Sequence, residues 1–257
     1  MPSHRFANWV RAVGSSEVLL GGVCTDLFSL LLPGECAGCS SPAVGGVCDQ
    51  CLAECVPPRG PSCPTCGASW QPTSHRTLGC GRCARFGRPF AFEAAVSFWE
   101  YQGAARRIVH AFKYHARRDV LRPLGVRMAR SARAASVVAQ GQRLLVVPVP
   151  ARRKSRRRRG YDQAVDLATG VASVLRAPLE REALRRRRQP ALSQAETRGD
   201  FRRRQLRGSF SARPGRVLGR TVLLVDDVMS TGATVDAAAR ALGLAGAQAV
   251  FVLVLAG

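Results

Sequence analysis

VLLVDDVMSTGATV, residues 222–235, is the stretch of the chain that decides its fold. Four apolar residues, 222–225, are typical of a buried parallel strand, and Asp226 and Asp227 follow at its carboxyl end. A loop of small and hydroxyl residues then leads into an apolar helical pattern over residues 234–244. Because ligands of parallel α/β sheets bind beyond the carboxyl ends of the strands, this loop is the expected binding site.

The two halves of this stretch suit two parts of one ligand. Gly232 lets the backbone turn tightly, and N–H groups from Met229 to Thr234 at the helix start are expected to form a nest for phosphate. The hydroxyls of Ser230, Thr231 and Thr234 are further donors. Two carboxylates beside a phosphate would repel it, but they accept hydrogen bonds from the 2′- and 3′-hydroxyls of a ribose. A 5-phosphoribosyl group therefore fits both halves.

The alternative is an ordinary strand end whose aspartates cap the helix. The predicted binding residues are Asp226, Asp227, Val228, Met229, Ser230, Thr231, Gly232, Ala233 and Thr234, and the two aspartates are also the predicted catalytic residues.

Strand and helix patterns alternate on both sides of this stretch. Strands are expected at residues 94–101, 144–149, 221–225 and 249–255, and helices at 103–114, 121–138, 162–175 and 234–244. Such alternation predicts a parallel α/β sheet with helices on both faces.

The segment before this domain is rich in cysteine, glycine and proline and shows no sustained helical or strand period. Eight cysteines form four Cys-x-x-Cys pairs, a spacing that presents two thiolates to one ion; two pairs complete the shell of a structural zinc. The predicted ligands are Cys36, Cys39, Cys48, Cys51, Cys63, Cys66, Cys80 and Cys83. Sequential pairing, as in a double zinc ribbon, is favoured over a crossed arrangement, and disulfides or redox-active dithiols are the other reading. Cys24 and Cys55 match no pair, and His75 is expected to be a loop residue rather than a ligand.

The chain has 257 residues, enough for a substantial core, and a formal net charge of +22. Residues 1–90 hold seven arginines and five acidic residues, so almost all of the excess lies in residues 91–257. A polyanionic partner is one explanation. A preference for arginine over lysine is the other, since Lys113 and Lys154 are the only lysines, but it does not explain the excess of base over acid.

The apolar residues 18–32 are too few for a membrane span and include Asp26, so we expect a helix that packs on the protein, without membrane insertion. With no export signal, the chain is expected to be cytoplasmic, where paired cysteines more often bind metal than form disulfides. The expected organisation is an N-terminal helical segment (1–32), a double zinc ribbon (33–90) and the α/β domain (91–257).

The loop after Asp227 is neither a Walker A loop nor a dinucleotide-binding GxGxxG motif. It resembles the binding motif for phosphoribosyl pyrophosphate (PRPP) of type I phosphoribosyltransferases. A fuller resemblance, from residue 32 onward, is to the ComF/GntX family. It rests on LLPGECAGC (31–39), FKYHARRDVLRPLG (112–125) and VPVPARRKSRRRRGYDQA (147–164), where Asp162 replaces the commoner asparagine.

This resemblance implies a phosphoribosyltransferase-like domain that binds PRPP, with Mg²⁺ bridging the pyrophosphate oxygens. It places the basic run after the strand at 144–149 near the pyrophosphate, where it would neutralise a leaving group. The residues concerned are Arg152, Arg153, Lys154, Arg156, Arg157, Arg158 and Arg159. A solvated, flexible loop is the alternative for any one of them.

Two functions remain open from the sequence. One is transfer of phosphoribosyl from PRPP, for which no residue identifies an acceptor pocket or a general base. The other is an accessory role in natural transformation, with arginines of residues 152–159, 181–188 and 202–207 tracking the backbone of single-stranded DNA.

Overall fold

The computed structural model describes residues 34–58, 61–69, 80–131, 143–187 and 208–257 of the chain. Its centre is a four-stranded sheet in the order β3-β8-β7-β4, in which every pairing is parallel. The strands are β3 (Ala94–Trp99), β4 (Leu144–Pro148), β7 (Thr221–Val228) and β8 (Ala249–Ala256). The predicted parallel α/β architecture is confirmed.

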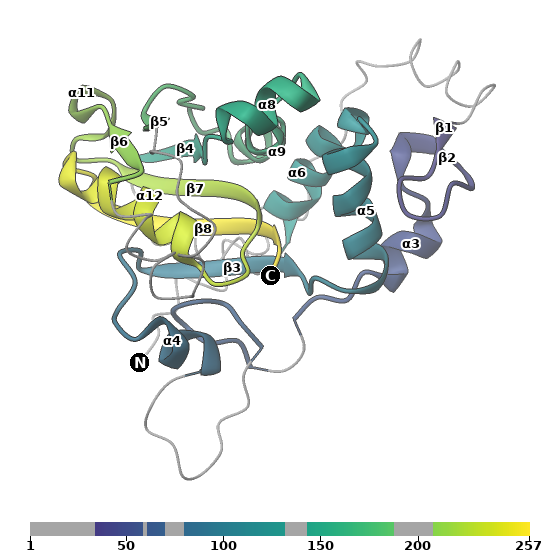
Figure 1. Ribbon diagram of the computed structural model, residues 1–257, viewed down its shortest axis with the longest axis horizontal. Coiled ribbons are helices and arrows are strands. Elements are labelled where there is room, and N and C mark those ends of the chain that lie inside the picture. The colour runs from purple at the N-terminus through teal and green to yellow at the C-terminus, as the bar shows by residue number, and fades with distance from the viewer. Residues whose placement is uncertain (1–33, 59–60, 70–79, 132–142, 188–207) are drawn as a thin grey trace, which may run out of the picture.

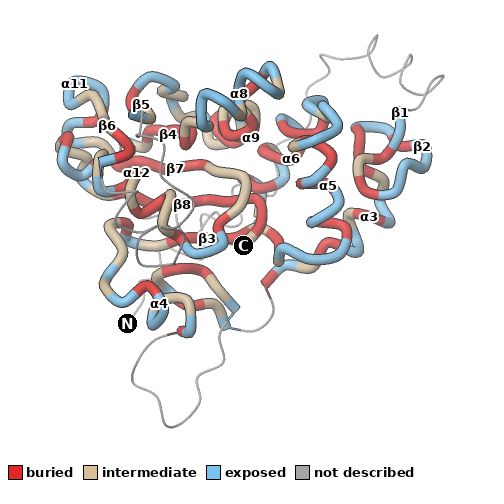
Figure 2. Tube along the Cα trace, viewed as in Figure 1, coloured by how far each residue is buried: buried red, intermediate tan, exposed pale blue. Residues whose placement is uncertain are grey.

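Strand β8 is apolar throughout, and β7 is apolar from Val222 to Val225, because both faces of these stretches are covered. In β7, Leu223 and Val225 pack into one hydrophobic core, whereas Val222 and Leu224 pack into the other. Figure 2 shows β8 buried along almost its whole length and β7 buried except toward its carboxyl end. The first partly exposed residue of β7 is Asp226, so the charged residues of the strand begin where the helices no longer bury it.

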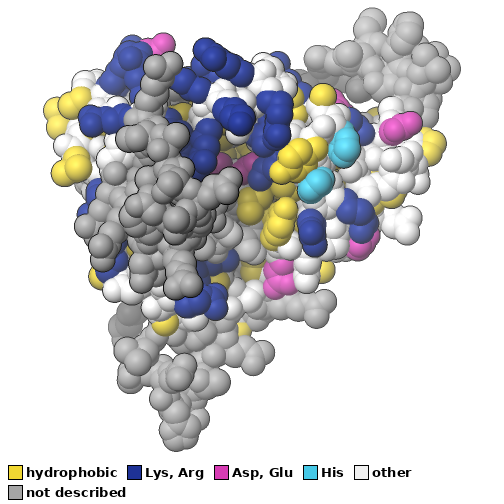
Figure 3. Space-filling model, viewed as in Figure 1, with side chains coloured by type: hydrophobic (Ala, Val, Ile, Leu, Met, Phe, Trp, Pro, Cys, Tyr) yellow, Lys and Arg dark blue, Asp and Glu magenta, His cyan; other side chains and the backbone are white. Residues whose placement is uncertain are grey.

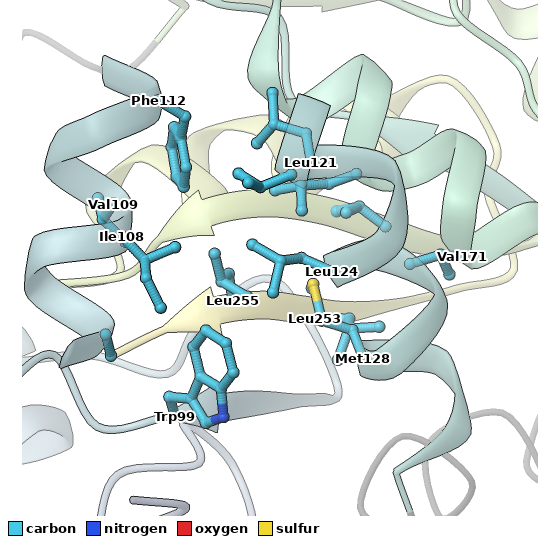
Figure 4. Packing of buried hydrophobic residues seen from close by; sticks show 14 of the residues in the cluster. Trp99, Ile108, Val109, Phe112, Leu121, Leu124, Met128, Val171, Leu253 and Leu255 are labelled. Carbon is cyan, nitrogen blue, oxygen red and sulfur yellow. The ribbon is translucent and has the colours of Figure 1, made fainter. Parts of the chain in front are cut away.

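Three helices cover one face of the sheet: α5 (Gly103–Tyr114), α6 (Leu121–Arg130) and α9 (Gln163–Leu175). Figure 4 shows Ile108 and Phe112 of α5 and Leu124 of α6 converging with Leu253 and Leu255 of β8. The other face is covered by α12 (Ala233–Leu244) and by the antiparallel ribbon of β5 (Leu184–Arg186) and β6 (Phe210–Ala212). The short helices α8 (Arg153–Arg159) and α11 (Pro214–Val217) and the 3₁₀ turn η2 (Arg118–Val120) complete this part of the chain.

Helices α6 and α9 touch through their backbones at two glycines. A Cβ atom at Gly125 would lie 2.1 Å from the Leu167 carbonyl oxygen, and one at Gly170 would lie 2.2 Å from the Arg122 carbonyl oxygen. No side chain larger than hydrogen fits between backbones this close. The sequence pattern gave no sign of this contact.

The cysteine-rich segment forms two small units that contact different parts of the sheet domain (Figure 1). The first contains β1 (Gly34–Glu35), β2 (Pro42–Ala43), the 3₁₀ turn η1 (Val44–Gly46) and α3 (Asp49–Glu54), and it packs on α5. The second contains α4 (Gly81–Phe86) and lies beside β3, where the Ala95 N–H donates to the Thr65 carbonyl at 2.8 Å.

Most expected elements are present with small shifts at their ends. The strand expected at 221–225 continues to Val228, and the basic run after β4, expected as a turn or loop, forms the helix α8. The expected segment 1–32, residues 132–138 of the second helix, Cys24, His75 and residues 202–207 lie outside the described residues. Within the part of the chain that is described, no helix is long and apolar enough to cross a membrane.

The glycine contact yields a stability prediction. Gly170→Ala inserts a methyl group against the backbone of α6, and we expect it to lower the free energy of unfolding by about 2 kcal/mol. Urea denaturation followed by circular dichroism measures the change.

Gly243→Ala is the matched control, because its added Cβ atom meets nothing within 4 Å and the residue lies in a helix. This variant is expected to gain up to about 1 kcal/mol from helix propensity. Equal stability of the two variants would contradict the close contact.

Candidate functional site

The two acidic residues predicted as the ribose site lie together at the carboxyl end of β7. The Asp227 N–H donates to Asp226 Oδ1 at 2.9 Å, and the Val228 N–H donates to Asp227 Oδ1 at 2.7 Å. Lys113, from the last turn of α5, places its Nζ 2.9 Å from Asp227 Oδ2. The side chains of Lys113 and Asp227 are 20% and 13% exposed, so this ion pair is well shielded but open on one side.

The electrostatic setting of the pair favours a ligand that donates hydrogen bonds. Burial, followed by the charge of Asp227, raises the pKa of Asp226 well above its usual value, against the Asp227 N–H and Lys113, which lower it. The excess of negative charge is therefore already difficult to accommodate in the free protein. Hydroxyl donors relieve such a site, whereas a further anion placed directly on it would not.

The loop after β7 supplies backbone donors, with one correction to the expected nest. The Met229 N–H donates to the Ala256 carbonyl at 2.9 Å, and its side chain is buried in the core, so Met229 belongs to the sheet rather than to the nest. Ser230 and Thr231 are exposed, and the Ala233 N–H donates to Thr231 Oγ1 at 3.3 Å. The nest is thus left to the backbone from Ser230 to Thr234, at the start of α12.

Gly232 has a conformation and surroundings that suit only glycine. Its φ of +80° lies in the left-handed region, and a Cβ atom there would be 2.7 Å from the ring of Phe90. Phe90 stacks in turn on Phe86 and Phe92, with ring centroids 4.0 and 4.7 Å away. The turn of the loop is therefore packed against an aromatic stack from the cysteine-rich segment.

A cleft of about 230 Å³ brings the carboxylates together with residues from four other parts of the chain. It lies where the carboxyl ends of β4 and β7 open side by side, as expected for a parallel sheet. Of the nine predicted loop residues, Asp226, Asp227, Val228 and Thr234 line it. The remaining lining residues are Lys113, Val149, Pro150, Ala151, Arg152, Ser155, Arg159, Asp162, Gln163, Ala164 and Arg186. We call this space the phosphoribosyl cleft, after the ligand that the sequence predicts for it.

Three charged residues in the phosphoribosyl cleft were not predicted as site residues: Lys113, Asp162 and Arg186. Asp162 precedes α9 and accepts from the Ala151 N–H at 2.9 Å, which fixes the turn after β4. Burial raises the pKa of Asp162, whereas the N–H groups of Ala151 and Ala164 lower it. Arg186 lies over the ring of Phe210 at 4.8 Å and donates to the Pro150 carbonyl at 3.3 Å. Burial lowers the pKa of Arg186.

The predicted basic run is divided by the helix that it forms. Arg152 and Arg159 line the phosphoribosyl cleft, whereas Arg153 and Arg156 line a neighbouring groove. Lys154, Arg157 and Arg158 line neither of these two spaces; Arg158 lies over the ring of Tyr114 at 5.5 Å. The run is therefore not one uniform anion site.

The block Arg159-Gly160-Tyr161 ties α8 to the end of α5. Gly160 ends α8 with a φ of +80°, the Arg159 Nε donates to the Lys113 carbonyl at 2.9 Å, and the buried Tyr161 hydroxyl donates to the Phe112 carbonyl. These bonds hold the last turn of α5 in place. Lys113 is thereby positioned next to Asp227.

The eight paired cysteines form two tetrads, each from two sequential pairs. The first comprises Cys36, Cys39, Cys48 and Cys51, and the second Cys63, Cys66, Cys80 and Cys83; within each, the four sulfur atoms lie within 4.8 Å of one another. A tetrahedral ion with metal–sulfur bonds of about 2.3 Å requires sulfur atoms about 3.8 Å apart. The sulfur–sulfur separations of 3.6 Å (Cys39–Cys48) and 3.7 Å (Cys63–Cys83) fit this requirement, whereas Cys66 and Cys80 lie closer, at 3.2 Å. Each tetrad could hold a metal ion.

In each tetrad, backbone donors favour the thiolate, the form that binds metal, at one cysteine in particular: Cys36 in the first and Cys80 in the second. Burial raises the pKa of Cys36, but N–H groups of Cys48, Gly38 and Cys39 outweigh it and bring the pKa to about 6. Burial likewise raises the pKa of Cys80, which the Cys83 N–H and neighbouring thiols lower to about 7. Burial raises the pKa of three other tetrad thiols, Cys51, Cys66 and Cys83. It likewise raises the pKa of the unpaired Cys55 to about 12.

The second tetrad is connected to the helix that follows the loop. Arg88, just after α4, contacts Asp236 of α12 through two bonds of 2.5 and 3.3 Å. Asp236 is buried and also accepts from the Ala91 N–H at 2.8 Å. The first turn of α12 is thus held by the segment that carries the cysteines.

Comparisons with known proteins agree with this geometry. The sequence profile of the phosphoribosyl transferase domain matches residues 162–257. The protein named DNA utilization protein YhgH is 31% identical to this chain over 227 residues, both in Salmonella typhimurium and in Escherichia coli strain K12. Each alignment covers 86% of this chain and 96% of the relative.

Two solved structures are also similar. One is glutamine PRPP amidotransferase from B. subtilis complexed with ADP and GMP, at 24% identity and a TM-score of 0.39. The other is described as the allosteric regulatory enzyme of purine biosynthesis, at 23% identity and a TM-score of 0.38. Each match covers 57% of this chain and 30% of the solved chain.

The Arg88–Asp236 contact yields a second stability prediction. Asp236→Ala leaves Arg88 and the Ala91 N–H without their acceptor, and we expect a loss of about 3 kcal/mol in the free energy of unfolding. Urea denaturation measures it.

Glu54→Ala is the control, because the Arg107–Glu54 pair also joins a cysteine-bearing unit to the sheet domain, but both of its side chains are 47% exposed. Glu54→Ala should lower the free energy of unfolding by no more than about 1 kcal/mol. If Asp236→Ala costs no more than Glu54→Ala, the buried pair does not hold α12.

Proposed function

This chain belongs to the ComF/GntX family, and we propose that it binds PRPP in the phosphoribosyl cleft and transfers the phosphoribosyl group to an acceptor. The observation that carries the proposal is the presence, in one cleft, of two adjacent carboxylates, Thr234 from the first turn of α12, and several basic side chains. No single one of these features selects PRPP. Together they match its three parts: a ribose diol, a 5′-phosphate and a pyrophosphate.

The ribose is assigned to Asp226 and Asp227. Both carboxylates have oxygens that can accept from the 2′- and 3′-hydroxyls, and burial together with the charge of Asp227 raises the pKa of Asp226. The 5′-phosphate is assigned to the backbone between Ser230 and Thr234 at the start of α12, where N–H groups and the helix dipole favour an anion.

The pyrophosphate is assigned to the arginines of the cleft. These are Arg152, Arg159 and Arg186, and the partly buried Arg186 retains more of its electrostatic effect than an arginine in open water. Glycosyl transfer from PRPP develops positive charge on the ribose and negative charge on the departing pyrophosphate. Carboxylates under the sugar and arginines around the leaving group are placed to stabilise both.

Metal ions have two separate roles in this proposal. Zinc in the two cysteine tetrads would be structural, because four thiolates leave no open position for substrate. Asp226, Asp227 and Asp162 provide the oxygen ligands that Mg²⁺ prefers, and Mg²⁺ would neutralise charge on the bound pyrophosphate.

A second candidate function is binding of single-stranded DNA, favoured by the name of the YhgH relatives and by the distribution of charge. Figure 3 shows Lys and Arg side chains gathered over the upper part of the molecule, around α8. Arg153, Arg181, Arg185 and Arg187 are exposed there. Such a surface suits a phosphate backbone and is compatible with PRPP binding in the cleft.

The carboxylate assignment is tested with Asp226→Asn/Asp227→Asn. Amides accept more weakly from the ribose diol, so PRPP affinity measured by isothermal titration calorimetry should fall about 100-fold. Inorganic pyrophosphate has no diol, and the loss of negative charge should leave its affinity unchanged or increased. Opposite responses to these two ligands separate hydrogen bonding to the sugar from general electrostatics.

Asp166→Asn is the matched control, because Asp166 is an acidic residue of α9 that pairs with Arg118 outside the cleft. It should bind PRPP as the wild type does. If the double variant also binds PRPP with wild-type affinity, the carboxylates do not hold the ribose and the proposed function is wrong.

DNA binding makes a separate prediction about salt. The affinity for a labelled single-stranded oligonucleotide can be measured by fluorescence anisotropy at NaCl concentrations between about 50 and 200 mM. Because binding releases counterions from the DNA, the logarithm of the affinity should fall steeply and linearly with the logarithm of the salt concentration. A flat dependence, or no binding at 50 mM, would exclude the arginine surface as a DNA site.

A further inference from the structure

A second hollow adjoins the phosphoribosyl cleft, and three of the exposed arginines considered above for DNA binding line it. Its volume is about 480 Å³, within the range of small-molecule sites. It shares four residues with the phosphoribosyl cleft, namely Pro150, Ala151, Asp162 and Arg186, so the two spaces are neighbours across one wall. The other lining residues are Pro148, Arg153, Arg156, Val165, Arg181, Glu182, Leu184 and Arg185. We call this second space the arginine groove.

The arginine groove combines apolar and basic linings. Pro148, Val165 and Leu184 contribute apolar atoms from β4, α9 and β5. Arg153 and Arg156 lie one helical turn apart on α8, and Arg181 and Arg185 flank the opposite side. Apolar surface beside several guanidinium groups is suited to a ligand that has both a flat ring and a phosphate.

The charge of the groove is only partly balanced. Its one glutamate, Glu182, already pairs with Arg213 at 2.7 Å and lies 4.0 Å from Arg185. Considering described residues alone, Arg153, Arg156 and Arg181 take part in no ion pair. An anionic ligand would therefore meet three guanidinium groups that form no ion pair in the described residues, with Asp162 as the second carboxylate of the lining.

We propose that the arginine groove is the acceptor site, and that the acceptor is a nucleotide whose phosphate binds Arg153 and Arg156 while its base covers the apolar lining. This inference rests on the proposed function, since it needs PRPP in the neighbouring cleft. A nitrogen or oxygen of the acceptor base attacks C1′ of PRPP. The C1′–oxygen bond to pyrophosphate breaks, the electron pair leaves with pyrophosphate, and the acceptor proton is released to water in the open groove.

The position of the shared wall supports this geometry. Arg186 and Asp162 line both spaces, and Arg186 is also assigned to the pyrophosphate side of PRPP. The bond that breaks joins C1′ to pyrophosphate, so an acceptor must approach the sugar near that side. A ligand in the groove would lie next to Arg186 and so near the reacting bond.

Helix α8 offers a matched test of this assignment. Arg153→Gln/Arg156→Gln removes two charges that line the groove, and Lys154→Gln/Arg157→Gln removes two charges at the same spacing on residues that line neither space. Both changes affect the same helix and the same net charge. A solvated basic surface would respond equally to the two variants.

The probes are adenosine 5′-monophosphate and adenosine, titrated by calorimetry into the full-length protein in the presence of saturating PRPP. We expect the nucleotide to bind wild type at least 10-fold more tightly than the nucleoside. The groove variant should lose at least 10-fold in nucleotide affinity, and the control variant less than 2-fold. A 10-residue oligonucleotide with and without a 5′-phosphate shows whether a free nucleotide or a strand end is the better source of the phosphate.

Failure of this inference differs from failure of the proposed function. Titration of PRPP into the wild-type protein tests the cleft by itself. If PRPP binds but the nucleotide does not, or if the two α8 variants lose nucleotide affinity equally, the acceptor assignment is overturned while the cleft assignment stands. Urea denaturation of both variants checks that a selective loss in the groove variant does not come from unfolding.

Discussion

Burial of β7 on both faces is the constraint on which the rest of the structure depends. Five consecutive residues, 221–225, are buried, so no charged side chain can occur before the strand leaves its cover. Two carboxylates then emerge together at one edge of the sheet. Because β4 is the parallel neighbour of β7, the turn after β4 opens at the same edge, and the phosphoribosyl cleft forms between the two strand ends.

Because several carboxylates lie together at this edge of the sheet, their negative charge must be balanced by basic residues from other parts of the chain. Asp162 joins Asp226 and Asp227 in the phosphoribosyl cleft, and Lys113 is the residue that pairs directly with one of them. That lysine is held in position because Arg159 and the residues after it bind the carbonyls at the end of α5. The shape of the site thus depends on the hydrogen bonds that Arg159 and Tyr161 donate to the backbone of α5.

The sequence could predict the sheet because its signal is local. Runs of apolar residues in the sequence predicted β4, β7 and β8. The amphipathic pattern at 103–114 predicted α5 with the same ends that the structure has. The basic run at 153–159 has no apolar period, although arginine favours helices, so α8 was not expected as a helix. Ribbon β5–β6 could not be found either, because it pairs short segments far apart in the chain.

The candidate site was predictable to a similar degree. Asp226, Asp227 and the loop glycine came from a contiguous motif, and the sequential grouping of the cysteine pairs is what the structure shows. Arg186 and Lys113 reach the cleft only through tertiary packing, and the rarity of lysine was the one available hint for Lys113. The Met229 N–H was expected in the phosphate nest, but it bonds to β8 instead, because β7 continues three residues beyond its apolar stretch. The domain boundary at residue 90 stays a prediction.

The two cysteine tetrads belong to units that contact different sides of the phosphoribosyl cleft. Cys36 and Cys51 of the first share a hydrophobic core with Ile108 and Phe112 of α5, the helix that ends at Lys113 and the carboxylate side. Phe90 and Arg88, which follow the second, contact Gly232 and Asp236 on the phosphate side. The cysteine-rich segment has little apolar core of its own, so its folding depends on staples and on these contacts. A metal ion that fixes each tetrad would therefore also restrict the position of the adjoining half of the cleft, which gives a physical reason for joining both units to one phosphoribosyltransferase sheet.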